Sequence, residues 1–163
     1  MCLAFAKSQS AVYSAGLPTY GKVFVSVADR DKRAMVAPIK RLVDMGFKVA
    51  ATAGTADVLR KHGVECEVLV KQHMANLEHD NLKTTVEAIL AGEIALVVNT
   101  PYGTGARVDG YEIRTAAVTA SVPSITTIQG LSAAVEGIEA RSKSKYAVRS
   151  LQEYAIASRT ANA

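Results

Sequence analysis

The segment Thr52-Ala-Gly-Thr55 is the part of this sequence whose residue types point most directly to chemistry. It follows a run of small and β-branched residues typical of a buried strand, and a helical pattern begins within it. A chain that turns from a strand into a helix leaves backbone N–H groups free at the positive end of the helix dipole. Gly54 permits close approach of a ligand, and Thr52 and Thr55 add hydroxyl groups. This combination favours binding of a phosphate.

Cationic and polar residues also follow the other apolar runs. Lys32 and Lys71 would balance the charge of an anion, and Asn99 and Thr100 are donors and acceptors of the kind that orient a sugar or a base. Each feature alone has an ordinary structural explanation, namely a helix N-cap, a solvated surface lysine or a turn. Their occurrence at the same end of several strands predicts an anion pocket built from those strands together.

The elements that would position these residues are five apolar runs of strand length, which alternate with helical patterns. The predicted strands are residues 22–27, 47–52, 66–70, 94–98 and 124–128, and the predicted helices are residues 31–46, 54–59, 82–90, 112–120 and 131–140. Pro38 falls inside the first helix, which we therefore expect to start late or to kink. The alternation predicts an α/β fold: a single open, mainly parallel five-stranded sheet with helices on both faces. Ligands of such sheets bind beyond the carboxyl ends of the strands.

The composition excludes several classes of protein. The 163 residues fit one domain, and 49% hydrophobic residues with 21% charged residues are enough for a core. The net charge of +4 is spread along the chain without a basic run interleaved with aromatic residues, so we expect no nucleic-acid partner. No apolar run reaches the roughly 18 residues of a membrane span, so we expect no membrane partner. Two cysteines and no signal-peptide pattern predict a soluble protein of the reducing cytoplasm.

No catalytic residue and no metal site are predicted. His73 and His79 lie near acidic residues, but their spacing matches no standard zinc motif. His62 follows a predicted helix, where it can bond the last carbonyls, and Cys66 is expected to pack as a small hydrophobic residue. No serine–histidine–aspartate arrangement and no dinucleotide-binding glycine pattern occurs.

Six segments, in order and over nearly the whole chain, resemble the C-terminal allosteric domain of the carbamoyl-phosphate synthase large subunit. They are residues 4–9 (AFAKSQ), 21–32 (GKVFVSVADRDK), 51–56 (ATAGTA), 97–101 (VVNTP), 109–118 (DGYEIRTAAV) and 122–127 (VPSITT). The resemblance implies the methylglyoxal synthase-like (MGS-like) fold. It also implies a linker from a preceding synthetase domain at residues 1–19, an effector-binding domain at residues 20–142 and a C-terminal tail at residues 143–163.

The resemblance further implies that the domain is a regulatory fragment and not an enzyme by itself. Its expected ligands are nucleotide effectors of the UMP or IMP type, with ornithine near the domain border. Its partners would be the ATP-grasp domains of the parent subunit and, indirectly, the small glutaminase subunit. The domain itself would need no cofactor, whereas the parent ligase, which serves pyrimidine and arginine biosynthesis, would use ATP and Mg²⁺.

The resemblance also assigns roles to individual residues. The implied phosphate cradle consists of Lys32, Thr52, Gly54, Thr55 and Lys71, with Ser26 beside it, and the implied ribose or base side consists of Asn99, Thr100 and Pro101. The chain departs from the family at residues 72–80 (QHMANLEHD), where many relatives have a Glu-Gly-Arg-Pro type segment. This departure predicts a different effector preference.

Three other functions fit a fold of this kind. The alternative function is a methylglyoxal synthase-like lyase acting on dihydroxyacetone phosphate, which needs a carboxylate base beside the phosphate. The Gly-Gly-Asp motif of that enzyme is absent here. A cyclohydrolase domain of purine synthesis shares the Gly-Thr loop but has further motifs that this sequence lacks. A purely structural domain that has lost its ligand is the third.

Overall fold

The computed structural model of the chain describes residues 2–13, 16–70, 83–100, 102, 106–143 and 150–161. Within these residues the chain forms five β-strands, seven α-helices and one 3₁₀ helix, η1 (Asp29–Asp31). The strands are β1 (Lys22–Val27), β2 (Lys48–Ala51), β3 (Glu67–Val68), β4 (Ile94–Thr100) and β5 (Ser124–Ile125). The helices are α1 (Cys2–Val12), α2 (Lys32–Asp44), α3 (Ala53–Lys61), α4 (Thr85–Leu90), α5 (Ala106–Thr119), α6 (Ile128–Lys143) and α7 (Leu151–Ala161).

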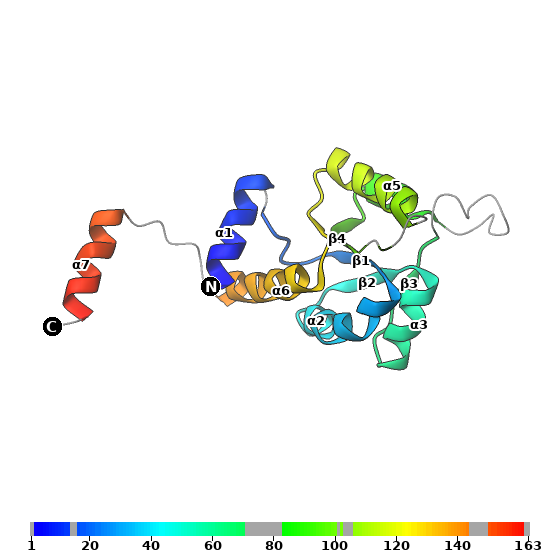
Figure 1. Cartoon of the computed structure of the whole chain (residues 1–163), viewed down its shortest axis with the longest axis horizontal. Coiled ribbons are helices and arrows are strands. Elements are labelled where there is room, and N and C mark those ends of the chain that lie inside the picture. The colour runs from blue at the N-terminus through cyan, green and yellow to red at the C-terminus, as the bar shows by residue number, and fades with distance from the viewer. Residues whose placement is uncertain are drawn as a thin grey trace.

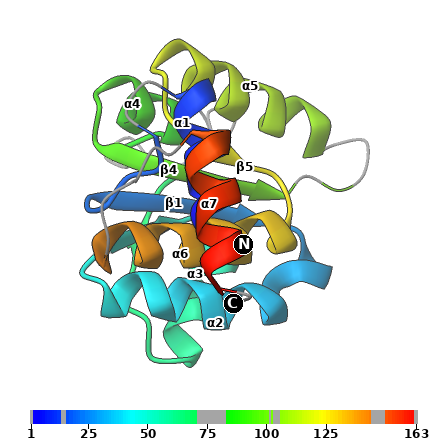
Figure 2. The same cartoon turned by 90° about the vertical axis from the view of Figure 1, so that its left-hand side faces the viewer.

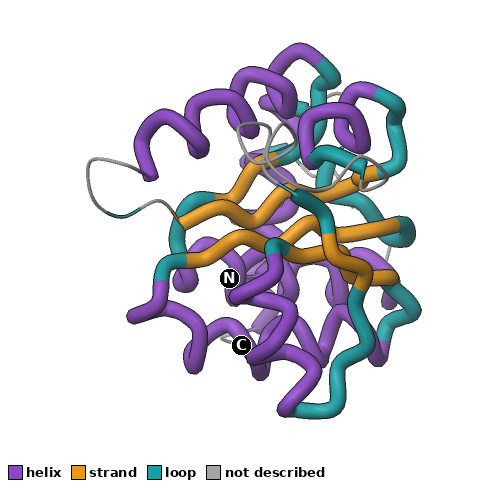
Figure 3. The backbone as a smooth tube through the Cα atoms, turned by 90° about the vertical axis from the view of Figure 1, so that its right-hand side faces the viewer, coloured by secondary structure: helices purple, strands orange, loops and turns teal. Residues whose placement is uncertain are grey.

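The five strands form one parallel sheet with the order β3-β2-β1-β4-β5 (Figure 3). The chain adds β2 and β3 on one side of β1 and then returns to add β4 and β5 on the other side. The strand order therefore reverses between β1 and β4, which is where sheets of this class bind ligands at the carboxyl ends of the strands. The register places Ser26 opposite Asn99 and Val27 opposite Thr100, so β1 and β4 end side by side.

Helices cover both faces of the sheet, as the sequence predicts (Figures 1 and 2). Helices α2, α3 and α6 cover one face, and α4 and α5 cover the other. The buried side chains form two cores: the first core lies between the sheet and α2, α3 and α6, and the second core lies between the sheet and α4 and α5. Along β1, Val23 and Val25 belong to the first core, and Phe24 between them belongs to the second. All three side chains are fully buried, and each contributes about 1.5–3 kcal/mol of hydrophobic stabilisation. The predicted α/β fold is therefore confirmed.

Helix α2 begins at Lys32 and continues through Pro38, so the predicted late start is wrong. A proline inside a helix costs about 3 kcal/mol. The same helix buries Met35, Ile39 and Leu42 completely, and this burial contributes roughly 5–9 kcal/mol at the per-residue value given above. Burial therefore outweighs the cost of the proline. Val43 of the same helix is 37% exposed.

Other boundaries differ from the predicted ones at the ends of elements. Strands β3 and β5 have two residues each, and α5 begins at Ala106, six residues before the predicted start at 112. Helix α7 was not predicted, although the sequence contains its start signal. Ser150 Oγ accepts a hydrogen bond from Glu153 N (3.2 Å), and Glu153 Oε2 accepts one from Ser150 N (2.6 Å). This reciprocal pair is a capping box that starts the helix.

The N-terminal helix α1 packs against α6, and Figure 1 shows the two helices side by side at the edge of the sheet. Ala6 is fully buried in the first core, and Arg141 Nη1 on α6 donates to the carbonyl oxygen of Leu17 (2.5 Å). Residues 2–12 of the predicted linker are thus helical and contribute to the core. Among the described residues, no helix has the length and hydropathy that crossing a membrane requires.

Candidate anion-binding site

The predicted site residues that the structure describes come from the carboxyl ends of three neighbouring strands. They are, in chain order, Ser26, Lys32, Thr52, Gly54, Thr55, Asn99 and Thr100. Strand β1 lies between β2 and β4, and parallel strands are about 4.8 Å apart. The ends of β2 and β4 are therefore separated by two such spacings, or about 10 Å. The sheet order brings these residues to one edge, on either side of the point where the order reverses.

The start of helix α3 presents free backbone donors at this edge. Thr52 is the N-cap residue, with an extended backbone (φ −67°, ψ 151°), and its carbonyl oxygen accepts from the N–H groups of Thr55 (2.9 Å) and Ala56 (2.8 Å). Within the described part of the chain, no acceptor engages the N–H of Ala53 or Gly54. These two groups point out of the helix start, where the dipole favours negative charge.

The ammonium of Lys32 lies over this helix start. A Cβ atom placed on Gly54 would be 3.2 Å from Lys32 Nζ, and among the described residues no other atom outside the backbone of α3 and the two chain neighbours would lie within 4 Å of it. Lys32 Nζ also forms an ion pair with Asp29 Oδ1 (2.7 Å), and this pair holds the pKa of the Asp29 carboxyl below its usual range. The Asp29 side chain is 94% exposed, so its ion pair is weakly held and an incoming anion can displace it.

Three threonine hydroxyls join the elements that surround this site. Thr55 is 1% exposed, and its Oγ1 accepts from the N–H of Val27 (3.4 Å) and from Thr52 Oγ1 (3.2 Å). Thr100 Oγ1 accepts from the N–H of Ala28 (3.1 Å). The first contact ties the end of β1 to α3, and the second ties the turn after β1 to the end of β4. Thr55 and Thr100 thus hold the edge together. The Thr52 hydroxyl belongs to the most accessible of the three threonines.

Asn99 lies opposite Ser26 in the sheet and is 4% exposed. Its amide nitrogen Nδ2 is buried and has no hydrogen-bond partner among the described residues. A buried donor left unpaired costs about 1–3 kcal/mol. Placed next to the end of β4, this donor is suited to a polar group of a ligand at this edge. Lys71, Pro101 and residues 72–80 lie outside the described residues, so their predicted roles remain predictions.

Sequence reasoning missed one pair at the same edge. Arg30 of η1 stacks on Tyr102, which follows β4, with Cζ 4.1 Å from the centre of the ring. The two residues are 72 positions apart, and nothing in either local pattern indicates that they meet. The only available signal was indirect: each residue closely follows a predicted strand.

The other reactive side chains have structural roles. The ring of His62 contacts the carbonyl oxygen of Val58 through Nδ1 (2.8 Å), as predicted for a histidine at a helix end. Cys66 is half-buried against the first core, and this burial raises the pKa of its thiol. The described residues contain no cluster of three or more histidine, cysteine, aspartate or glutamate side chains that could hold a metal. His73 and His79 lie outside them.

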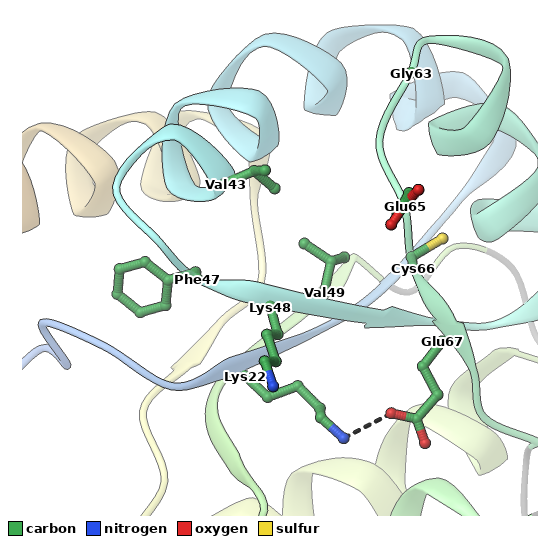
Figure 4. A pocket seen from close by; sticks show the side chains of 9 residues that line it. All are labelled: Lys22, Val43, Phe47, Lys48, Val49, Gly63, Glu65, Cys66 and Glu67. Atoms are coloured by element: carbon green, nitrogen blue, oxygen red, sulfur yellow. Dashed lines mark hydrogen bonds and ion pairs between the residues drawn. The ribbon is translucent and has the colours of Figure 1, made fainter.

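A separate hollow of about 760 Å³ lies at the opposite edge of the sheet, where β1, β2 and β3 begin (Figure 4). Its wall contains two lysines and two glutamates: Lys22, Lys48, Glu65 and Glu67. Lys22 Nζ is paired with Glu67 Oε2 at 2.6 Å. Because the charges of this wall balance, the hollow has no preference for an anion, unlike the edge at the carboxyl ends.

A family model described as "MGS-like domain" matches residues 34–126, which is more than half of the chain. The chain belongs to the MGS-like domain family. The matched region includes the Lys48–Ala51 strand, the start of α3 and the whole of β4. The match to the MGS-like domain therefore includes most of the sheet edge that forms the candidate site.

Three curated relatives of this MGS-like domain have the name "Carbamoyl phosphate synthase large chain". Those from Mycobacterium sp. (strain JLS) and Beutenbergia cavernae are 56% identical over 151 residues, and that from Mycobacterium tuberculosis (strain ATCC 25618 / H37Rv) is 55% identical over the same length. The matches cover 92–93% of this chain but 13–14% of each relative. The matched part is the C-terminal region of the large chain.

A solved structure titled "Crystal structure of ForH" has a similar fold. It superposes with a TM-score of 0.56 at 22% sequence identity, over 76% of this chain and 82% of that chain. At this level of identity the likeness concerns the fold alone.

Proposed function

We propose that this MGS-like domain binds the phosphate of a nucleoside monophosphate, with UMP as the reference ligand. The observation that supports the proposal is the cradle formed by the free N–H groups at the start of α3 and the Lys32 ammonium above Gly54. Backbone donors, a helix dipole and one cation are together suited to a phosphate. The buried amide of Asn99 provides a further donor on the ribose or base side.

The relatives support a regulatory role for the domain. The chain spans 13–14% of the length of each of these large chains, so it corresponds to one part of a much longer ligase that would use ATP and Mg²⁺. We propose that effector binding here favours one arrangement of the domain against its ATP-grasp neighbours in a cytoplasmic carbamoyl-phosphate synthase. Such coupling changes the affinity of the neighbour's sites by roughly 1–3 kcal/mol. The domain would tune carbamoyl phosphate synthesis and catalyse no step itself.

The test is isothermal titration of the 163-residue chain with UMP, and with uridine as the ligand that lacks the phosphate. We expect heat with UMP and none with uridine. Lys32→Ala should weaken UMP binding about 10- to 150-fold, because a hydrogen bond to a charged group contributes about 1.5–3 kcal/mol. Lys40→Ala, an exposed lysine of the same helix, is the matched control and should leave the affinity unchanged.

Equal binding of UMP and uridine, or unchanged affinity in Lys32→Ala, would remove phosphate recognition from this edge. The alternative lyase is tested in the same samples by adding dihydroxyacetone phosphate and following its consumption. Among the described residues, Asp29 provides the carboxyl that pairs with Lys32, and its lowered pKa makes it a weak base. We therefore expect no turnover.

A further inference from the structure

Arg30 and Tyr102 form an exposed stack at the mouth of the candidate site. The Arg30 side chain is 62% exposed and Tyr102 is 64% exposed, while the guanidinium carbon lies 4.1 Å from the ring centre. An exposed cation–π contact contributes only about 0.5–1 kcal/mol. Strands β1 and β4 are already joined by a parallel ladder that is regular from Val23 to Val27, so the fold does not depend on this stack.

Hydrogen bonds fix the place of the stack relative to the sheet. The N–H of Ala28 donates both to Thr100 Oγ1 (3.1 Å) and to Thr100 O (3.2 Å), which joins the turn after β1 to the last residue of β4. Arg30 lies two residues beyond Ala28, and Tyr102 lies two residues beyond Thr100. The stack therefore stands beyond the carboxyl ends of β1 and β4, where the strand order reverses.

The stack and the phosphate cradle lie at the same edge of the sheet, after different strands. The cradle at Gly54 follows β2, and Tyr102 follows β4, two strand spacings or about 10 Å away. The buried amide nitrogen of Asn99, which has no hydrogen-bond partner among the described residues, belongs to the strand at the Tyr102 end. A ligand that reaches all three needs an anionic group at one end, and a polar group beside a flat group with a π surface at the other. A nucleoside monophosphate has these groups.

We propose that Tyr102, held in place by Arg30, is the stacking platform for the base of the nucleotide. The proposal rests on the proposed function and adds the feature that selects a nucleotide over a simple sugar phosphate. Arg30 covers one face of the ring, and the base stacks on the exposed remainder. Stacking of a base on an aromatic side chain contributes about 1–3 kcal/mol and tolerates different bases. The platform therefore selects for the presence of a base more strongly than for its identity.

The experiment compares UMP with ribose 5-phosphate, which has the phosphate and the sugar but no base, by calorimetric titration of the same chain. Tyr102→Ala should weaken UMP binding about 5- to 150-fold, the equivalent of the stacking contribution given above, and should change ribose 5-phosphate binding by less than about twofold. Tyr102→Phe should bind UMP like the unaltered chain. Tyr111→Ala, on α5 and 66% exposed, is the control with matched exposure and should change neither affinity.

Arg30→Lys keeps the charge but removes the planar group that stacks on the ring. It should weaken UMP binding in the same direction as Tyr102→Ala, again without an effect on ribose 5-phosphate. Circular dichroism of each variant checks that the fold is retained.

The outcomes separate the platform from the proposed function. If Lys32→Ala weakens both ligands while Tyr102→Ala weakens neither, phosphate binding stands and the platform is overturned. An equal loss of both ligands in Tyr102→Ala also overturns it, because Tyr102 would then act on the phosphate and not on the base. If the unaltered chain binds neither ligand, both proposals fail.

Discussion

Replacement of Gly54 by alanine should abolish tight phosphate binding without destabilising the fold. Gly54 is the second residue of α3 and its φ is not in the left-handed region, so the backbone accepts alanine. Alanine is favoured over glycine in helices by up to about 1 kcal/mol. Among the described residues, the atom from outside α3 that lies near the added Cβ is Lys32 Nζ at 3.2 Å, at the end of a flexible side chain that can move by a few tenths of an ångström. The free energy of unfolding should therefore stay the same or rise slightly.

The loss of binding follows from the same contact. The added methyl group occupies the space in which a phosphate would meet the N–H groups of Ala53 and Gly54, and it displaces the Lys32 ammonium. Loss of one hydrogen bond to a charged group costs about 1.5–3 kcal/mol. UMP binding should therefore weaken by about 10- to 150-fold for each such hydrogen bond that is lost. Urea unfolding followed by circular dichroism measures the stability, and calorimetric titration with UMP measures the affinity.

Gly46→Ala is the matched control with the opposite expected result. Gly46 follows α2 with φ +92°, and no atom of the described residues is recorded within 4 Å of a Cβ placed there. Alanine in this left-handed conformation costs about 1–2 kcal/mol, so stability should fall while UMP affinity is unchanged. Unchanged UMP affinity in Gly54→Ala, with the fold intact, would refute the placement of the phosphate at the start of α3.

Three further predictions concern charge and capping. Asp29→Asn removes the carboxylate that competes with the phosphate for Lys32. It should tighten UMP binding by no more than about fivefold in the same titration, because exposed ion pairs contribute little. Weaker UMP binding would contradict a competing role for Asp29. Thr84→Ala removes the capping box of α4, in which Thr84 Oγ1 accepts from Glu87 N, and should lower the free energy of unfolding in urea by about 0.5–2 kcal/mol, whereas Thr84→Ser should restore most of it. Hydrogen bonds from Lys143, and to a smaller extent from Arg41, lower the pKa of Glu139 in the folded chain. The contribution of Glu139 to the free energy of unfolding is therefore complete above the unfolded pKa of about 4.3, and it is lost as the pH falls through the lower folded pKa. The difference in melting temperature between the unaltered chain and Glu139→Gln should thus be constant above about pH 5 and should shrink as the pH falls further; a difference that does not shrink in acid would contradict it.

Local pattern accounts for much of what could be predicted. The run at residues 22–27 predicts β1 with its observed bounds. When helices cover both faces of a sheet, the side chains on both sides of a strand are buried, so the strand is a nearly continuous apolar run. The same kind of reasoning identifies the start of α3 from Gly54 and Thr55. Helix α7 shows the limit of this approach: its capping box, Ser150 and Glu153, was visible in the sequence, but the segment has too few apolar residues to be recognised as a helix by periodicity.

The site could be predicted as a set of residue types but not as an arrangement. The sequence indicates that Lys32, Gly54 and Asn99 each follow or end a strand, and parallel strands bring such residues to one edge. It does not indicate that the Lys32 ammonium lies over Gly54, that Asn99 is buried without a partner, or that Thr55 is used to tie β1 to α3.

The sequence by itself determined the five strands and the helices between and after them up to α6, but not α1 or α7, and it showed that hydroxyl groups, cations and a helix start occur after the strands. The tertiary structure decided the strand order β3-β2-β1-β4-β5, and with it the reversal between β1 and β4 and the stack of Arg30 on Tyr102. The physical reason is that hydrophobic periodicity shows which face of an element is buried but not which neighbour buries it. That choice depends on how all the helices and strands pack at once, so residues 72 positions apart can meet without any local sign that they do.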